Sequence, residues 1–182
     1  MSEIQLNHRR LSPKRIGELA EAAFLLKAET LGFSLAKPWG DSERYDFVLD
    51  SGSRLWRIQL KSTSALHARG YEVQPIYNVY GKGKSAYTAD DIDALAAYIL
   101  PLDIWYVLPV EAFAPASNLR FYPDIDCKTA RWENYREAWH LLNSCSASSR
   151  CADNENCKGF HDWRRCFLIG VGIPSAALTD LS

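Results

Sequence analysis

The sequence has no long uninterrupted apolar run and no large excess of charge of either sign. Residues 1–10 are polar and basic, without the apolar core of a secretion signal, and Pro101 and Asp103 interrupt the longest apolar region, Leu95–Pro109. A membrane-spanning helix needs about 20 consecutive apolar residues. We therefore expect no membrane span and a cytoplasmic location. The formal net charge of −1 gives no general affinity for polyanions, so a nucleic-acid partner must be bound by local basic patches.

Several motifs that mark common chemistries are also absent. The chain has no Gly-x-Ser-x-Gly elbow, no dinucleotide-binding glycine pattern and no phosphate-binding P-loop. Its five cysteines include no Cys-x2-Cys knuckle, and an odd number favours reduced thiols or metal ligation over a disulfide framework. The C-terminal segment contains five residues of types that bind zinc, namely Cys145, Cys151, Cys157, His161 and Cys166. A loop with free thiols is the favoured interpretation, and a structural zinc site is the alternative.

The length and composition are those of one folded domain. The chain has 182 residues, of which 47% are hydrophobic and 24% charged, enough for one hydrophobic core but short for two domains of typical size. We expect the main domain to span residues 1–142. Residues 143–182 are expected to add a Cys-containing loop and a C-terminal strand, within Phe167–Ala177, packed on the same domain.

Capping signals predict two helices, and amphipathic spacing predicts a third. Ser12, followed by proline, opens a helix that ends at Gly32. The capping-box pattern Thr88–Asp91 predicts a second helix, which continues through Ile99 and stops at Pro101. A third helix is amphipathic and carries its apolar side at Trp132, Tyr135, Trp139 and Leu142.

Strands are predicted between these helices. A short strand begins at Phe33 and runs into a loop that reaches Arg44, and residues 62–85 are expected to be irregular. Runs rich in β-branched and aromatic residues predict strands at Tyr45–Leu49, Leu55–Lys61, Ile104–Leu108 and Leu119–Tyr122. The order of elements predicts an α/β fold with a mixed central β-sheet flanked by helices.

Two of these strands form a predicted antiparallel hairpin. A turn-rich linker joins Tyr45–Leu49 to Leu55–Lys61. Successive side chains of a strand point to opposite faces of the sheet. Gln59 and Lys61 therefore share a face, and pairing of the strands brings Asp46 to that same face. The sequence thus predicts a cluster of one carboxylate, one amide and one ammonium group.

Such a cluster matches the needs of phosphodiester hydrolysis. A hard divalent cation such as Mg²⁺, bound by oxygen ligands, neutralises phosphate charge and lowers the pKa of an attacking water. A neighbouring lysine orients that water and stabilises negative charge that develops at phosphorus. Polar residues on the exposed face of a strand are nevertheless common, so this pattern alone does not establish a site.

The hairpin and the first helix resemble the PD-(D/E)xK nuclease superfamily, in particular its branch of small intron-encoded homing endonucleases and related bacterial proteins. The resemblance covers about two-thirds of the chain, leaves out the segment after Leu142, and implies a restriction-endonuclease-like core. The matching segments are Gly17–Glu21, Leu31–Phe33, Arg44–Leu49 and Arg57–Thr63, and more weakly Tyr87–Asp93 and Ile104–Pro109.

The resemblance also implies roles for individual residues. Asp46 is the expected central metal ligand and Lys61 the catalytic lysine. Gln59 stands where many relatives have Glu or Asp, and it is expected to be a catalytic residue and a metal ligand, although the site then has one negative charge fewer. Glu21, preferred over its neighbour Glu18, and the backbone carbonyl of Leu60 are expected to complete the catalytic and metal-binding set. The implied cofactor is Mg²⁺, for which Mn²⁺ is expected to substitute.

These features predict a metal-dependent endonuclease that acts on double-stranded DNA in homing, restriction or repair. A homo-oligomer is expected because one such site cuts one strand. Local basic residues are expected to contact DNA phosphates, namely Arg10, Lys14, Lys82 and Lys84. The sequence leaves open a Holliday-junction resolvase, a catalytically silent DNA-binding protein that retains the nuclease fold, and a zinc-stapled interaction module in the C-terminal segment.

Overall fold

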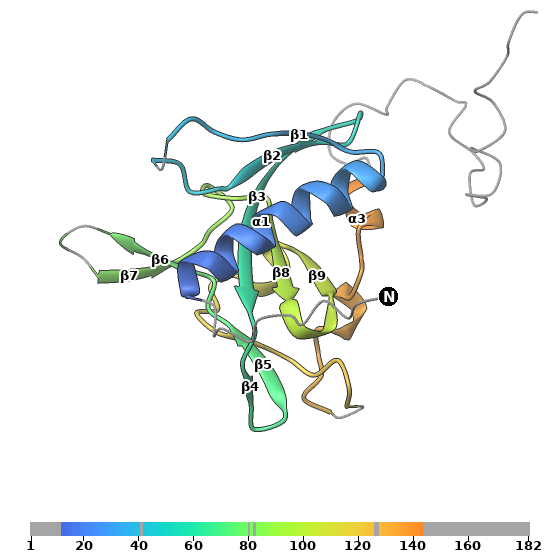
Figure 1. Ribbon diagram of the computed structural model, residues 1–182. Coiled ribbons are helices and arrows are strands. Elements are labelled where there is room, and N and C mark those ends of the chain that lie inside the picture. The colour runs from blue at the N-terminus through green and yellow to red at the C-terminus, as the bar shows by residue number, and fades with distance from the viewer. Residues whose placement is uncertain (1–11, 41, 80, 82, 126–127, 144–182) are drawn as a thin grey trace, which may run out of the picture. The chain divides into compact units, whose positions relative to one another are not determined.

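The structure, a computed structural model, describes residues 12–40, 42–79, 81, 83–125 and 128–143. All of them lie within one compact unit, Met1–Cys145 (Figure 1). In these ranges no helix combines the length and the apolar character that crossing a bilayer would require.

The centre of the unit is a five-stranded sheet. Its strand order is β1-β2-β3-β8-β9, with bounds Ser34–Ala36, Phe47–Asp50, Leu55–Thr63, Ala94–Ile99 and Ile104–Pro109. The β3 and β8 strands pair in parallel, and the other neighbours pair antiparallel. The predicted mixed central sheet is therefore confirmed, as is the hairpin of β2 and β3.

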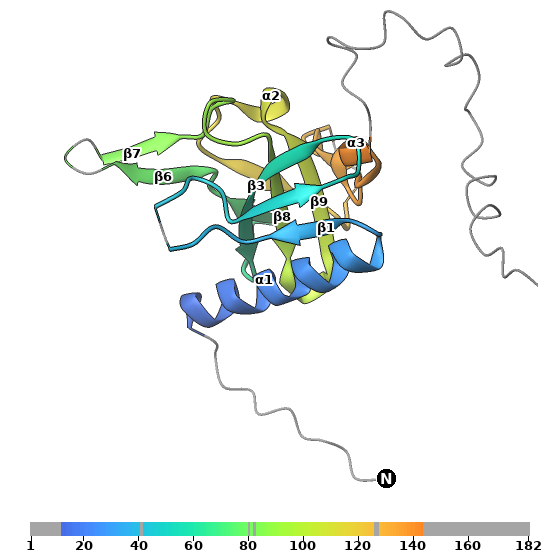
Figure 2. The same ribbon diagram turned by 90° about the horizontal axis from the view of Figure 1, so that it is seen from above.

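Helix α1 (Pro13–Thr30) begins and ends where the sequence predicts. The Ser12 hydroxyl accepts a hydrogen bond from the Arg15 backbone N–H at 3.2 Å, which caps the first turn. Gly32 has a φ of +85°, a left-handed conformation that glycine adopts without steric cost, and it ends the helix. The helix buries Ala20, Phe24 and Ala28. Figure 2 shows α1 along one side of the central sheet.

Each face of the central sheet has its own hydrophobic core. One core includes α1, and its buried aromatic members are Phe24, Phe33, Phe47, Trp56, Tyr98, Trp105 and Trp139. The other includes α2 (Val110–Phe113) and a small sheet of order β10-β5-β4. In Figure 2, α1 and α2 lie on opposite sides of the sheet. Because both faces are covered, β8 (Ala94–Ile99) is apolar and buried on both sides.

The predicted helix from Thr88 to Ile99 is wrong in its main part. Thr88 and Asp91 do make the capping contacts, with the Asp91 carboxylate accepting from the Thr88 N–H and hydroxyl at 2.9 Å each. After this single turn the chain becomes β8, and all six of its residues are buried. A buried apolar run lacks the periodicity that separates a helix from a strand. Pairing with β3 and β9 on either side decides the outcome.

Residues 62–85 are more regular than predicted. They contain the hairpin of β4 (Leu66–His67) and β5 (Gly70–Val73) and the hairpin of β6 (Ile76–Val79) and β7 (Gly83–Ala86). The predicted strand at Leu119–Tyr122 is confirmed as β10 (Leu119–Phe121), which pairs with β5. These strands have only two to four residues each. A strand this short is too brief to show a recognisable alternation of apolar and polar residues in the sequence.

The predicted third amphipathic helix is also wrong. The segment contains only a 3-10 turn, η2 (Glu133–Tyr135), and a one-turn helix, α3 (His140–Asn143). Between them Glu137 has a φ of +48°, and its backbone N–H donates to the Trp105 carbonyl at 2.8 Å. The Glu137 carboxylate accepts from the Trp105 N–H at 2.8 Å. These bonds attach the segment to the edge strand β9 and interrupt a continuous helix.

Several predictions fall on residues that the structure does not describe. The expected strand within Phe167–Ala177 and the ligand-type residues Cys145 to Cys166 lie outside the described ranges, as do Arg10 and Lys82. The packing of residues 143–182 on the main domain and the zinc alternative therefore stay predictions.

Candidate active site

Asp46 lies at the entrance to β2 and is bonded to the adjoining strand. Its backbone N–H donates to the Ile58 carbonyl at 2.9 Å. Its Oδ2 atom accepts from the Leu60 backbone N–H at 2.7 Å and from Gln59 Nε2 at 2.5 Å. The hairpin register therefore fixes the Asp46 carboxylate against two consecutive residues of β3.

Gln59 is the one buried polar residue among those the structure describes, with 7% of its surface exposed. Besides the bond to Asp46, its Nε2 donates to the Leu60 carbonyl at 3.0 Å. Its Oε1 accepts from the Tyr87 hydroxyl at 2.9 Å. A buried amide with partners on both sides has little rotational freedom, so Gln59 is a rigid part of the site.

Lys61 follows two residues later on the same face of β3. Its Nζ donates to the Ile76 carbonyl at 3.3 Å and lies 5.6 Å from the centroid of the Tyr87 ring. Burial lowers the pKa of Lys61, and the negative charge of Asp46 partly offsets this effect. The structure thus brings Asp46, Gln59 and Lys61 together, as the hairpin alternation predicts.

Glu21 of α1 points toward these residues from the neighbouring element. Its Oε2 is 2.5 Å from the Nζ of Lys37, which follows β1. Glu18 is instead paired with Arg15 on the exposed side of α1, at 3.1 Å. The preference for Glu21 over Glu18 therefore agrees with the geometry, although its role as a ligand stays a prediction.

A cavity of about 160 Å³ connects the four predicted catalytic residues. Its lining residues are Gly17, Ala20, Glu21, Asp46, Gln59, Leu60, Lys61 and Ser62. A second hollow of about 140 Å³ shares Glu21 and Asp46 with the first and is otherwise lined by Lys37, Pro38, Gly40, Glu43 and Tyr45. Glu21 and Asp46 therefore line both hollows.

The electrostatic environment of Asp46 favours the arrival of a cation. Burial raises the pKa of Asp46, and the charge of Glu21 acts in the same direction. The Leu60 N–H and the charges of Lys61 and Lys37 oppose the rise. A buried carboxylate with a raised pKa gains when a positive charge binds beside it, so the site is suited to a metal ion or another cationic group.

The donor set fits Mg²⁺. The cavity offers the carboxylates of Asp46 and Glu21 together with the Leu60 main chain. In the described part of the chain, no group of three His, Cys, Asp or Glu side chains lies close enough to hold a metal by itself. Mg²⁺ commonly binds one or two carboxylates and fills its octahedron with waters and substrate oxygens. Gln59, whose Oε1 faces Tyr87, presents its nitrogen rather than its oxygen to Asp46.

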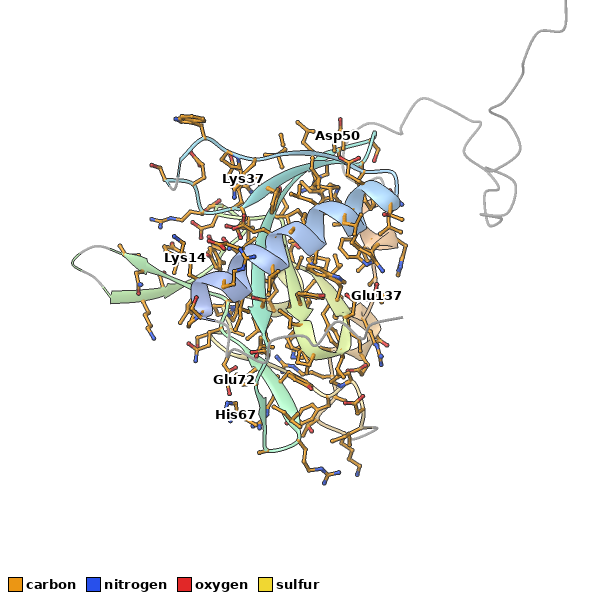
Figure 3. The ribbon with its side chains drawn as sticks, in the orientation of Figure 1. Lys14, Lys37, Asp50, His67, Glu72 and Glu137 are labelled. Atoms are coloured by element: carbon orange, nitrogen blue, oxygen red, sulfur yellow. The ribbon has the colours of Figure 1, made fainter. Side chains whose placement is uncertain are left out.

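The predicted DNA-contacting residues that the structure describes are on the surface. Lys14 lies in the first turn of α1 and Lys84 on β7, and both are exposed. Neither belongs to the lining of the two cavities. Figure 3 shows Lys14 and Lys37 at different points along the side of the unit from which the β6–β7 hairpin extends. Their contact with DNA stays a prediction.

Two residues of the site were missed in the sequence. Lys37 carries no signal there, because a lone lysine beside a proline looks like ordinary surface. Tyr87 does carry one, since it opens the segment Tyr87–Asp93 that matches the nuclease superfamily weakly. Its hydroxyl reaches Gln59 from 28 residues away, a contact that only the folded sheet reveals.

Comparison with known proteins agrees with this geometry. Residues 11–142 match the sequence model of the PD-(D/E)XK endonuclease family. A bacterial homing endonuclease, I-Ssp6803I, has a similar solved structure, with a TM-score of 0.65 and 31% sequence identity. The similarity covers 73% of this chain and 94% of that endonuclease. A search of curated protein sequences gives no match.

The matched region includes the whole hairpin, α1 and the residues that line the cavity. The family model spans well over half of the chain, and the restriction-endonuclease-like fold predicted from the sequence is that of the homing endonuclease. Membership of a family of endonucleases implies a hydrolase. On the site geometry and these two matches together, the chain belongs to the PD-(D/E)XK endonuclease family.

Proposed function

We propose that the protein is a Mg²⁺-dependent endonuclease that hydrolyses phosphodiester bonds in double-stranded DNA. The observation that carries the proposal is the cavity that Glu21, Asp46, Gln59 and Lys61 line together. Two carboxylates, a hydrogen-bonding amide and an ammonium group within one small space supply the metal ligands and the positive charge that phosphodiester hydrolysis requires. Mn²⁺ is expected to replace Mg²⁺.

Asp46, Glu21 and the Leu60 carbonyl would hold the metal ion. When bound, Mg²⁺ neutralises charge on the phosphate and makes a water more acidic. Lys61 lines the same cavity, and its ammonium group would donate hydrogen bonds to that water or to a phosphate oxygen. The water would lose a proton to solvent as its oxygen attaches to phosphorus, the opposite P–O bond would break, and the leaving alkoxide would take up a proton. The Asp46–Leu60 bond keeps the carboxylate in place throughout.

DNA would be bound by local positive charge, since the chain as a whole has a formal net charge of −1. Lys14 and Lys84 are exposed, and the Arg44 guanidinium lies 4.1 Å from the Tyr77 ring on β6. Basic side chains of this kind neutralise phosphates and position the duplex. Arg10 and Lys82 are proposed to add to this surface. One site cuts one strand, so we propose that a homo-oligomer makes the double-strand break.

The similarity to a bacterial homing endonuclease supports a homing-type role, with restriction and repair as related alternatives. A cytoplasmic location is part of the proposal. A Holliday-junction resolvase would use the same chemistry on a four-way junction. The shape of the DNA substrate distinguishes these roles, because the catalytic residues are common to both.

Purified protein incubated with supercoiled plasmid and with a four-way junction tests the proposal. We expect nicking or linearisation in Mg²⁺ or Mn²⁺ that is absent in EDTA and absent in Lys61→Ala. Preference for the plasmid supports the endonuclease, whereas preference for the junction supports the resolvase. If neither substrate is cut, even at a high ratio of protein to DNA and with plasmids of several sequences, the proposal fails.

A second candidate function is a catalytically silent DNA-binding protein. Gln59 removes one negative charge from the site and turns its nitrogen toward Asp46, which weakens the case for tight metal binding. This candidate predicts DNA binding in a mobility-shift assay with no cutting and with no change on adding Mg²⁺. Metal-dependent cutting by the wild-type protein rules it out.

A further inference from the structure

Tyr87 contacts two of the proposed catalytic residues with different parts of its side chain. Its hydroxyl donates to Gln59 Oε1 at 2.9 Å, and its ring lies 5.6 Å from Lys61 Nζ. Tyr87 is 3% exposed and Gln59 is 7% exposed, so the hydrogen bond between them is shielded from solvent. Burial also raises its pKa, and the hydroxyl stays protonated at physiological pH. The residue is therefore a permanent hydrogen-bond donor at the back of the site.

The chemistry of the neighbours fixes the orientation of the Gln59 amide. One end of that amide faces the Leu60 carbonyl, which can only accept, at 3.0 Å. The same end faces Asp46 Oδ2, which is already an acceptor for the Leu60 N–H. Two acceptors require a donor, so the nitrogen stands at that end and the oxygen must face Tyr87. The reverse orientation would place two oxygens against the amide oxygen.

Tyr87 is itself held firmly. Its backbone N–H donates to the Pro75 carbonyl at 3.4 Å, and its ring packs on the Tyr77 ring with centroids 5.0 Å apart. The next residue, Thr88, is capped by the Asp91 carboxylate. A side chain anchored from several directions can impose its orientation on a neighbour, because it has no alternative position of similar energy.

We infer that Tyr87 is a positioning residue that locks Gln59 with its amide nitrogen on Asp46. Gln59 then acts through Asp46, by holding the carboxylate in place, and does not offer its own oxygen to the metal. The inference rests on the proposed endonuclease function. It changes the expected role of Gln59 from metal ligand to support of a ligand, and it adds to the site a residue outside the hairpin.

Tyr87→Phe tests the lock because it removes the hydroxyl and keeps the ring beside Lys61. We expect kcat to fall by about 5- to 30-fold, the size associated with leaving one buried polar group unpaired, with KM for DNA unchanged. In a Gln59→Ala background the same change is expected to cost less than about twofold, because the partner of the hydroxyl is gone. An equal loss in both backgrounds, or no loss in the single variant, overturns the inference.

Tyr77→Phe is the matched control. Tyr77 belongs to the same ring pair, yet its hydroxyl makes no hydrogen bond with any residue that the structure describes at the site. The kcat of Tyr77→Phe is expected to stay within about twofold of the wild-type value. A loss as large as that of Tyr87→Phe would show that the effect is not specific to the Tyr87–Gln59 hydrogen bond, and it would overturn the inference.

The side-chain amide resonances of Gln59 give a readout that needs no cleavage. In the metal-free wild type we expect both Nε2 protons to be protected from solvent exchange, and in Tyr87→Phe to exchange faster. On adding Mg²⁺ to the wild type, protection is expected to persist. Loss of protection would mean that the amide turns its oxygen to the metal, which overturns the inference. A protected amide in a protein that cuts no DNA would contradict the proposed function instead.

Discussion

Gln59 Nε2 donates to Asp46 Oδ2 across 2.5 Å, so an amide nitrogen occupies the position from which many relatives are expected to present a second carboxylate. In this chain a hydrogen bond replaces what would be repulsion between two negative charges. Asp46 Oδ2 therefore has hydrogen-bond donors, from Gln59 and Leu60, before any cation binds. We therefore expect this hydrogen bond to stabilise the metal-free protein.

Gln59→Glu should reverse this advantage. Two buried carboxylates in contact share one proton, and the folded-state pKa of the pair rises. An acid whose folded pKa is raised loses stability as pH increases through that pKa. In EDTA we expect the free energy of unfolding of the variant to be similar to that of wild type at pH 4.5 and about 3 kcal/mol lower than that of wild type at pH 8. Urea titrations measure both values.

Mg²⁺ should restore the stability of Gln59→Glu at pH 8 and bind more tightly than to wild type, which calorimetry can measure. Gln59→Leu is the control, since it removes the amide without adding charge. If Gln59→Glu is as stable as wild type in EDTA at pH 8, the amide–carboxylate bond does not stabilise the metal-free site.

Lys61→Met should separate activity from stability. Burial lowers the pKa of Lys61, so its charged form is costly to the fold at neutral pH. We expect the variant to lose cleavage by at least about 100-fold and to gain about 1 kcal/mol of unfolding free energy at pH 7.

The pH dependence of that gain follows from the same shift. A lysine whose folded pKa is depressed makes the wild type more stable as pH rises through the folded pKa toward 10.5. The advantage of Lys61→Met should therefore shrink between pH 7 and pH 9.5. A variant less stable than wild type at pH 7 would show that Lys61 stabilises the site through the attraction between its charge and that of Asp46.

Asp93→Asn should weaken the link between β3 and the start of β8. The Asp93 carboxylate accepts from the Arg57 backbone N–H at 2.7 Å and pairs with the Arg57 and Arg54 guanidinium groups at 3.2 and 3.0 Å. Burial alone would raise the pKa of Asp93, but the bonds from Arg57 outweigh it and the pKa is lowered. We expect a loss of about 2 kcal/mol at pH 7.

A carboxyl group with a lowered folded pKa stabilises the protein above its ordinary pKa of 3.8 and loses that effect as pH falls through the folded pKa. The difference between wild type and Asp93→Asn should therefore narrow below pH 3.8, as urea titrations would show. Asp90→Asn is the control, because only the Asp90 backbone carbonyl contacts Arg57. A difference that is independent of pH would contradict the ion pairs.

Lys37→Gln should strengthen metal binding without changing the fold. The side chains of Lys37 and Glu21 are 57% and 37% exposed, and a pair of this kind contributes less than about 1 kcal/mol to stability. Its removal releases Glu21 from an ammonium group at the edge of the cavity. We expect the dissociation constant for Mn²⁺, measured by calorimetry, to decrease, with Lys14→Gln unchanged. Equal Mn²⁺ affinity in all three proteins would argue against Glu21 as a ligand.

The parts of the site that the sequence predicts are those set by local pairing. Asp46 and Gln59 are 13 residues apart and lie on strands joined by a short turn. Alternation along β3 then decides which side chains share a face, and the structure agrees. Helix α1 is predictable for a similar reason, because Ser12 and Gly32 give it both ends.

The remaining errors come from contacts between distant segments. The run Ala94–Ile99 is apolar throughout, and only its position between β3 and β9 makes it a strand. The Trp132–Leu142 segment has helical spacing, but Glu137 bonds to Trp105 and breaks it. Tyr87 reaches Gln59 only because β8 lies beside β3. No local pattern contains this information.

The parallel pairing of β3 with β8 also sets an order of events for a newly synthesised chain. The hairpin that holds Asp46 can form from neighbouring residues, whereas Tyr87 arrives only with the segment that leads into β8. Contacts between distant segments form later than local ones as a rule. A nascent chain that ends before Tyr87 would carry the hairpin with Asp46 and Gln59 but without the tyrosine that orients the glutamine. Catalytic competence would then be acquired late in synthesis, after the hairpin that carries the central carboxylate has left the ribosome.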